Sequence, residues 1–539
     1  MLVAPLSLRP LAAGLLAVVV LAPAAPARAY VPLMAGQRAQ PLNGTFNAVP
    51  VLHSNQPEEV EGPGILISTE PGVSYAAETG RALQNATYTF NGEFGVHLHH
   101  KYFPEYRREI RPQDRRTELT LGLILINPGT RPVTLQFERG AVRNSFQAPY
   151  LGTHKMGVRP LGPRPWNTGP GDATAVQMLR GSLDRELQQS VRIPPRSRIV
   201  LLSTQLPALG IANALLRGRS DGPFQMAVVA ASNPRSNADL VAVLDSRRLA
   251  PGRVYLTQLG DIRSGRVFSR VGGVAIGDAY QASLRHDLRS QGPLHVPFTS
   301  TSRTNFGTRD VQVNPLAVRM IDSALDNVGT YGVRFDIDLD LYGNGPYELV
   351  MSHPTSRAGT PRFTAFRGSL QVRSRDGLEE MHLGMQSGES YALTTLNLLP
   401  NVSNPVRISL VYPADATPGH LLSVVPASQL AIVQARQAEE LASAAVAAPA
   451  AAPQPQPRPR PVTAVAPAQP QLRPPAVRPV QPAPAQVLPP AQRQEAYRPP
   501  ANLPQAAPVR MPGVGSGLLD RYQEAVEAQQ EVMRGLLRN

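Results

Sequence analysis

The sequence predicts a mainly β protein with two β-sandwich-like domains, followed by a disordered proline-rich tail and a C-terminal amphipathic helix. Short apolar or alternating runs recur between turn residues, at a spacing typical of all-β domains. The clearest expected hairpin is residues 333–350: polar and apolar side chains alternate strictly over residues 334–341, and a Gly-Asn-Gly-Pro turn at 343–346 follows. The chain has 56 prolines, and they are densest after residue 448, which separates a folded body from a tail.

Residues 1–29 are expected to be a secretory signal peptide. Arg9 gives a positively charged start, residues 11–22 are apolar, and Ala27 and Ala29 form a small-x-small cleavage site before Tyr30. The apolar segment is too short to span a bilayer comfortably, although a retained anchor is the alternative. We therefore expect export to the periplasm, the outer envelope or the cell exterior, with no transmembrane segment in the mature chain.

Residues 30–215 are predicted to form the first β-rich domain. Residues 119–126 are apolar on both faces, as in a strand covered on both sides, whereas residues 133–138 alternate like a half-exposed strand. Pro128 and Pro132 interrupt the run, so the two strands are expected to be neighbours joined by a loop. A longer loop, residues 157–170, holds the only tryptophan. We expect Trp166 to plug one end of the sheets, with a sugar-stacking platform as the alternative.

Residues 216–427 are predicted to form the second β-rich domain. The pattern of strand, Asn-Pro turn and strand returns there twice, at Asn233 and at Asn404. A helix is expected over residues 428–447, because this segment is rich in alanine and Ser428 is placed to cap it.

The remaining residues predict a tail with two parts. Residues 448–515 are rich in Pro, Ala and Arg, and we expect a disordered, extended spacer. Residues 516–539 carry apolar side chains at three- and four-residue spacings, which is typical of an amphipathic helix. We expect this helix to dock on a protein partner, a second copy of the chain or an envelope surface, with folding back onto its own domain as the alternative.

Composition narrows the classes of partner. The net charge is +14 and comes almost entirely from arginine, since Lys101 and Lys155 are the only lysines. No nucleic-acid-binding module is recognisable, and export would separate the chain from most nucleic acid, so anionic envelope polymers are the expected partner. Cysteine is absent, which excludes disulfides and Cys-ligated zinc or iron–sulfur sites.

His97 and His99 are the best, though weak, candidates for metal ligands. Residues two apart on a strand point to the same face, so both rings could converge on one ion. A third ligand is not identifiable, and Phe94, Val96 and Leu98 lie on the other face. We therefore expect solvent-facing or structural histidines, and no bound metal.

Asp336, Asp338 and Asp340 form a second cluster of polar residues. Their alternation with apolar residues predicts a solvent-facing strand, with a calcium site as the alternative because a ladder of carboxylates needs neutralising charge. No nucleophile elbow, phosphate loop or dinucleotide motif occurs in the sequence. The sequence therefore predicts no catalytic residue and no cofactor.

Several short motifs resemble those of one known family. They are GGV at residues 272–274, HVPF at 295–298, TYGV at 330–333 and YPADATP at 412–418. Together they are similar to DUF3370, a family of secreted cyanobacterial proteins of unknown function, over about residues 40–426. The resemblance implies an exported β-rich protein and supplies no catalytic residue.

Two functions remain open at this stage. The first is a non-enzymatic envelope or extracellular protein whose β domains bind or pack against cell-surface polymer or protein. The alternative is an all-β carbohydrate-active hydrolase, which would require two carboxylates from different strands about 5 to 10 Å apart in one cleft.

Overall fold

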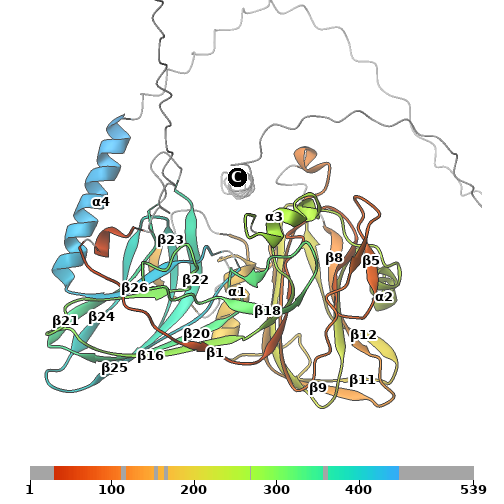
Figure 1. Cartoon of the computed structure of the whole chain (residues 1–539), viewed down its shortest axis with the longest axis horizontal. Coiled ribbons are helices and arrows are strands. Elements are labelled where there is room, and N and C mark those ends of the chain that lie inside the picture. Colours follow the sequence, from red (N-terminus) through yellow and green to blue (C-terminus); the bar gives the residue numbers. More distant parts are fainter. Residues whose placement is uncertain are drawn as a thin grey trace, which may run out of the picture. The chain divides into compact units, whose positions relative to one another are not determined.

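A computed structural model describes residues 30–447, except residues 35, 111–116, 151–155, 163–167, 268, 356–361 and 415. The predicted signal peptide, Trp166, the proline-rich spacer and the terminal helix lie outside the described residues. The described part is mainly β, as the sequence predicts, with its strands in two pairs of facing sheets (Figure 1). No helix in this part is both long enough and apolar enough to span a bilayer.

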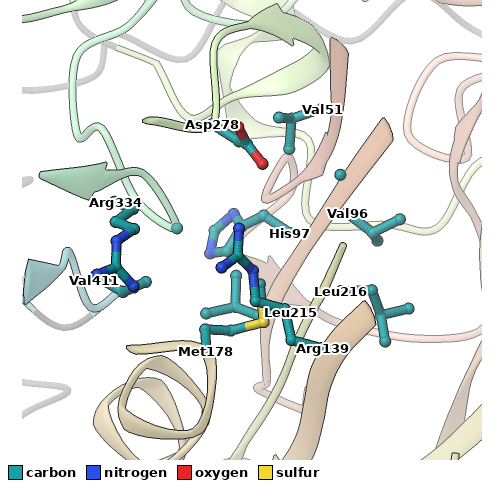
Figure 2. Close-up of a pocket in the computed structure, with 12 residues that line it drawn as sticks. Val51, Val96, His97, Arg139, Met178, Leu215, Leu216, Asp278, Arg334 and Val411 are labelled. Atoms are coloured by element: carbon teal, nitrogen blue, oxygen red, sulfur yellow. The ribbon is translucent and has the colours of Figure 1, made fainter. Parts of the chain in front are cut away.

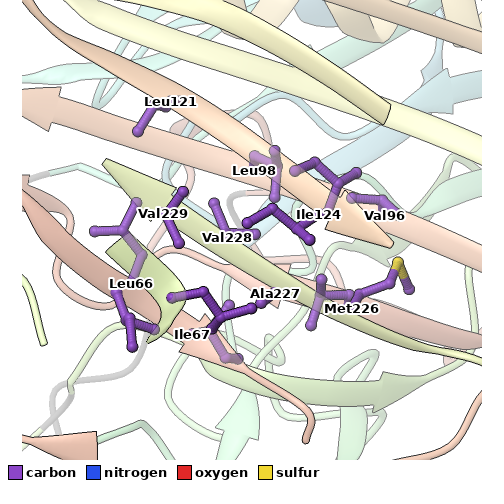
Figure 3. Close-up of a cluster of buried hydrophobic side chains, with 14 of the residues drawn as sticks. Leu66, Ile67, Val96, Leu98, Leu121, Ile124, Met226, Ala227, Val228 and Val229 are labelled. Carbon is purple, nitrogen blue, oxygen red and sulfur yellow. The ribbon is translucent and has the colours of Figure 1, made fainter. Parts of the chain in front are cut away.

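The first sandwich pairs a nine-stranded sheet with a four-stranded sheet. The nine strands are β2 (Pro50–Ser54), β3 (Glu59–Val60), β7 (Glu93–Tyr102), β9 (Val133–Asn144), β11 (Ser190–Ile193), β13 (Ile211–Ser220), β15 (Gly272–Ile276), β18 (Asn314–Arg319) and β19 (Asp326–Asn327). The four are β4 (Gly64–Ser68), β8 (Thr117–Asn127), β12 (Ser197–Pro207) and β14 (Gln225–Ser232). Side chains of β4, β7, β8 and β14 meet between the sheets and form the core (Figure 3).

The four-stranded sheet of this sandwich is covered on its other face as well. Residues 121–126 are buried throughout, which confirms the expectation drawn from their apolar character. Leu240 and Leu244 of helix α2 (Asn237–Asp245) are buried against this sheet. A Cβ at Gly122 would lie 3.1 Å from the Leu240 side chain, so the glycine permits the close approach of the helix. A small hairpin, β5 (Val73–Tyr75) and β6 (Ala82–Gln84), lies outside the large sheets.

The second sandwich pairs a seven-stranded sheet with a four-stranded sheet. The seven strands, in spatial order, are β1 (Thr45–Phe46), β16 (Ala279–Asp287), β20 (Arg334–Tyr342), β25 (Asn404–Val411), β22 (Thr364–Ser374), β23 (Gly377–Gln386) and β10 (Gly157–Pro160). The four are β17 (Leu294–Phe298), β26 (His420–Val425), β21 (Gly345–Ser352) and β24 (Ser390–Leu398). A second apolar cluster fills the space between these sheets.

The strand pairs that the sequence predicts as neighbours do not pair. β8 pairs with β12 and β14, whereas β9 pairs with β11 and β13 in the opposite sheet. β20 and β21 are likewise separated, although only Gly343 and Asn344 connect them. Each connection carries the chain across the core, because consecutive strands in a sandwich can bury their apolar faces against each other. Asn127 holds the first crossing by donating Nδ2 to the carbonyls of Arg131, Ile193 and Pro194 at 2.8–3.2 Å.

The expected boundary between residues 215 and 216 falls inside strand β13. β14, β15, β18 and β19, which lie beyond that position, belong to the first sandwich. In the other direction, β1 and β10 from the first part of the chain belong to the seven-stranded sheet of the second. Strand pairing joins residues far apart in sequence, so composition along the chain does not mark where one core ends.

Helix α1 (Pro170–Leu179) begins in the segment that the sequence predicts as a loop, with Pro170 at its first position. Its residues Ala175, Met178 and Leu179 pack against Leu215 of β13 and Val411 of β25, and so against both sandwiches. Helix α4 (Ala427–Ala447) agrees with the predicted helix, and Leu430 and Val433 pack against the strands β21 and β26. The remaining short elements are α3 (Leu259–Arg263) and 3-10 turns at Pro32–Met34, Arg107–Glu109 and Val254–Thr257.

Candidate functional site

The outer face of the seven-stranded sheet is a polar surface that carries depressions. Along β20, Phe335, Ile337, Leu339 and Leu341 point into the core and are at most 2% exposed. The residues between them are partly exposed, and they include Asp336, Asp338 and Asp340. This confirms the prediction of a solvent-facing strand.

Strand register places a polar or charged partner beside most of the aspartates. Asp336 lies between Gln281 of β16 and Ser409 of β25. Asp338 lies between Ser283 and Arg407 in the next row. Arg285 flanks Asp340 in the third row. Directly opposed residues on neighbouring strands have Cβ atoms about 5 Å apart, so each row forms a set of interacting side chains.

These partners neutralise the carboxylates. Arg407 binds Asp338 through two nitrogens, with Nε 2.6 Å and Nη2 2.7 Å from the two carboxylate oxygens. Asp336 accepts from Arg334 Nε at 2.7 Å and from the Ser409 hydroxyl at 2.5 Å. Arginine and serine thus provide the compensation that a calcium ion would otherwise supply. No group of three or more His, Cys, Asp or Glu residues suited to a metal ion occurs in the described ranges.

Two adjacent depressions lie along this face. The first has a volume of about 370 Å³ and is lined by Thr45 and Gln281 among others. The second has a volume of about 600 Å³ and reaches Arg373 and Arg375. Ser283, Asp338 and Arg407 line both. A chain of linked polar groups could therefore lie across several strands and meet hydrogen-bonding side chains at each.

Of the two expected settings for His97 and His99, solvent-facing or structural, the structure shows the structural one, because neither residue faces solvent. Both residues are only 1% exposed. Their rings are parallel, with centroids 6.5 Å apart, and Tyr331 from the second sandwich lies over His97 at 6.1 Å. Further along the same face, Asn213 joins His99 to α1: its Oδ1 accepts from His99 Nδ1 at 3.1 Å and its Nδ2 donates to Thr174. Helix α1 and the second sandwich therefore cover the face that would otherwise be exposed.

Burial keeps His53 and His97 neutral. Desolvation lowers the pKa of His53 to about 3 and holds the pKa of His97 well below its usual range, because burial disfavours the charged ring. The two rings meet through their Nδ1 atoms, which are 3.2 Å apart. His97 and His99 lie on the same face of β7, as predicted. That face is buried, and both rings belong to hydrogen-bonded clusters in the interior.

A serine, an aspartate and a histidine also come together near α1, although the sequence gives no sign of it. Asp172 lies in the middle: Ser369 Oγ donates to its Oδ1 at 2.8 Å, and His382 Nδ1 is 3.0 Å from its Oδ2. A nucleophilic serine needs the histidine as its direct base. Here the serine contacts the carboxylate, so the arrangement ties α1 to the strands β22 and β23 and does not activate a nucleophile.

A small cavity lies where the two sandwiches meet. It is lined by His97 of β7, Arg139 of β9, Met178 of α1, Arg334 of β20 and Asp278, together with apolar residues (Figure 2). Sequence reasoning did not single out Arg139, Arg334, Asp278 or Arg407. Arginines are spread over the whole sequence, and only strand register shows which of them meet a histidine or a carboxylate.

Weak similarities to solved structures include the following two. A xanthan lyase from Paenibacillus has a TM-score of 0.14 and 10% identity, and the match covers 68% of this chain and 26% of the lyase. The tandem family 51 carbohydrate-binding modules of a family 98 glycoside hydrolase from Streptococcus pneumoniae have a TM-score of 0.13 and 7% identity, covering 71% of this chain and 96% of theirs. These scores are too low to support an inference.

Sequence comparison identifies the family. No curated protein matches the sequence. The model of DUF3370, described as a protein of unknown function, matches residues 37–426, which are most of the chain and nearly all of both sandwiches. The chain therefore belongs to the DUF3370 family of proteins of unknown function.

Proposed function

We propose that this chain is an exported, non-enzymatic protein of the cell envelope or the extracellular space that binds an acidic polysaccharide. The binding surface is the outer face of the seven-stranded sheet. The observation that carries the proposal is the pair of adjacent depressions on this face, which share the Asp338–Arg407 pair. An extended face of this kind suits a linear polymer, because successive sugar units can meet successive rows of side chains.

The charge of the face favours an acidic polymer. Arg285, Arg373, Arg375 and Arg407 line the larger depression, against the two carboxylates of Asp338 and Asp340. Neither Arg373 nor Arg375 forms an ion pair with another described residue. Guanidinium groups bind carboxylate and sulfate oxygens through paired, charge-assisted hydrogen bonds. A polymer bearing uronate or sulfate groups would supply the missing negative charge.

The positions of the carboxylates favour binding over hydrolysis. A glycoside hydrolase needs two carboxyl groups on opposite sides of the scissile bond. The carboxylates that line the two depressions all come from β20. They lie two residues apart in a single row along that strand. Asp336 and Asp338 are also held by arginines at 2.6–2.7 Å.

The test compares two arginines that form the same kind of ion pair at different places. Arg407 binds Asp338 on the proposed face, and Arg266 binds Asp261 in α3, with nitrogens 3.0 and 2.6 Å from the carboxylate. We expect the mature chain to bind polygalacturonate, with dextran as the neutral control. Arg407→Ala should weaken binding about tenfold, because one guanidinium contact is lost. Arg266→Ala, which removes the same charge, should change it less than twofold.

The result is measured by titration calorimetry at fixed ionic strength. Equal weakening by Arg407→Ala and Arg266→Ala would mean that the chain attracts polyanions through its net charge alone, and would contradict the proposal. Release of new reducing ends from polygalacturonate would favour the hydrolase alternative.

Export is proposed from the sequence of residues 1–29. Mass spectrometry of the protein from native cells should find Tyr30 at the N-terminus, because the small residues Ala27 and Ala29 precede it. An intact segment ahead of Tyr30 in the envelope-bound protein would contradict cleavage.

A further inference from the structure

The cavity where the two sandwiches meet is lined by an arginine that has no ion-pair partner among the described residues. Its volume is about 20 Å³, which is enough for one water-sized group. Arg139 lines it and is partly buried, and desolvation lowers the pKa of its guanidinium. Arg139 forms no hydrogen bond or ion pair with any other described residue. A partly buried cation normally has an anion or an acceptor beside it, so the missing partner requires an explanation.

The carboxylate nearest to this cavity is already engaged. Asp278 lines the cavity, but Arg217 pairs with one of its oxygens, and Asn47 Nδ2 donates to the other at 2.6 Å. The second arginine of the lining, Arg334, binds Asp336 and donates to the carbonyl of Leu179 at 3.3 Å. Neither arrangement provides the acceptor that Arg139 lacks.

His97 directs a second donor into the same space. Its Nε2 is buried and has no partner among the described residues. Asn327 Nδ2 lies 3.4 Å from His53 Nε2, which makes that nitrogen an acceptor and places the proton of the neutral His53 ring on Nδ1. His53 Nδ1 then donates to His97 Nδ1 at 3.2 Å. The proton of the neutral His97 ring is therefore on Nε2, which is an N–H donor without an acceptor.

We propose that this cavity binds a small monatomic anion of the chloride class. The cation of Arg139 and the N–H of His97 both line it, and the guanidinium of Arg334 lies on the opposite wall (Figure 2). A metal ion is excluded by the chemistry, because these groups are donors and not ligands with free lone pairs. A water molecule would accept from His97 but would leave the Arg139 guanidinium without an ion-pair partner. The volume is too small for a polyatomic anion such as phosphate.

The first test measures the thermal stability of the mature chain in sodium chloride and in sodium methanesulfonate at equal ionic strength. Chloride should raise the unfolding temperature by about 2 °C for each tenfold increase above its dissociation constant, because it binds only the folded state. Arg139→Gln should abolish the difference between the two salts. Arg219→Gln, at an exposed position of the adjacent strand β13, removes the same charge and should preserve the difference.

The second test needs no variant and therefore does not depend on how Arg139→Gln folds. Crystals of the mature protein grown in sodium bromide should show an anomalous bromine peak between Arg139 and His97. Equal unfolding temperatures in the two salts together with no bromine peak would overturn the proposal and leave a cavity that holds water alone. A bromine peak that persists in Arg139→Gln would overturn the role of Arg139.

Discussion

Strands β7 and β20 carry the same alternation of polar and apolar residues but lie in opposite surroundings. On β20 the apolar residues fill the core of the second sandwich and the aspartates remain partly exposed. On β7, Phe94, Val96 and Leu98 fill the core of the first sandwich, but His97 and His99 are buried as well. Alternation therefore identifies two faces of a strand without showing whether the polar face meets water.

The chemistry of the side chains explains why each strand tolerates its surroundings. A histidine can lose its charge and remain a hydrogen-bonding group when another element covers it. A carboxylate cannot be buried in this way unless a cation accompanies it. Three aspartates in alternation indicate an exposed face more strongly than histidines do, and histidines are compatible with a junction between two parts of a protein.

The largest expected difference between the two strands appears in acid. Burial lowers the pKa of His53 and His100 to about 3 and of His97 well below its usual range, all on or beside β7. Below about pH 6.5 these histidines bind protons in the unfolded chain but not in the folded chain. The free energy of unfolding therefore falls as pH decreases towards 3. Each such histidine should contribute a loss of about 1.4 kcal/mol per pH unit.

Urea unfolding between pH 8 and pH 4 measures this loss. Replacing His100 by Gln should reduce the slope, since one titrating group is removed. A free energy of unfolding that is constant from pH 7 to pH 5 would show that the histidines of β7 are accessible to protons in the folded state.

Replacing a polar residue by alanine should lower the free energy of unfolding more on β7 than on β20. His99→Ala removes a buried ring and leaves Asn213 Oδ1 without its donor, which should cost about 2–4 kcal/mol. Asp338→Ala removes a side chain that is 45% exposed together with an ion pair to Arg407, and should cost less than about 1 kcal/mol. Chemical denaturation of both variants at pH 8 gives the comparison, and equal losses would contradict it.

A smaller effect is expected at the turn that covers His97. Gly332 has a φ of 77°, and a Cβ there would lie 2.9 Å from a Leu215 methyl group. Gly332→Ala should cost about 1–3 kcal/mol, because the backbone conformation disfavours a side chain and the contact is too close. Gly345 has a φ of 91° and open space where a Cβ would lie. Gly345→Ala therefore measures the cost of the backbone conformation alone. An equal loss for Gly345→Ala would mean that packing against Leu215 adds nothing.

The sequence predicts which faces of the strands are buried and where strands end. It does not predict which strands pair. Residues 121–126 are buried on both faces and β20 is exposed on one, as their patterns indicate. Pro128 and Gly343 mark the ends of strands correctly, but a turn residue does not show whether the next strand joins the same sheet or the facing one. The cavity at His97 draws its lining from several strands and a helix, and no local pattern connects Arg139 to Arg334.

The late position of β15 in the chain constrains the order in which the first sandwich can fold. Strand β2 pairs on one side with β7 and on the other with β15, which follows more than two hundred residues later. Ribosomes add about 5–20 residues per second, so β2 waits on the order of 10–45 s for β15. During that interval β2 has an unpaired edge, which a chaperone or a transport machinery would have to protect from pairing with another chain. A fragment that ends near residue 215 would keep this exposed edge permanently, and we expect it to aggregate.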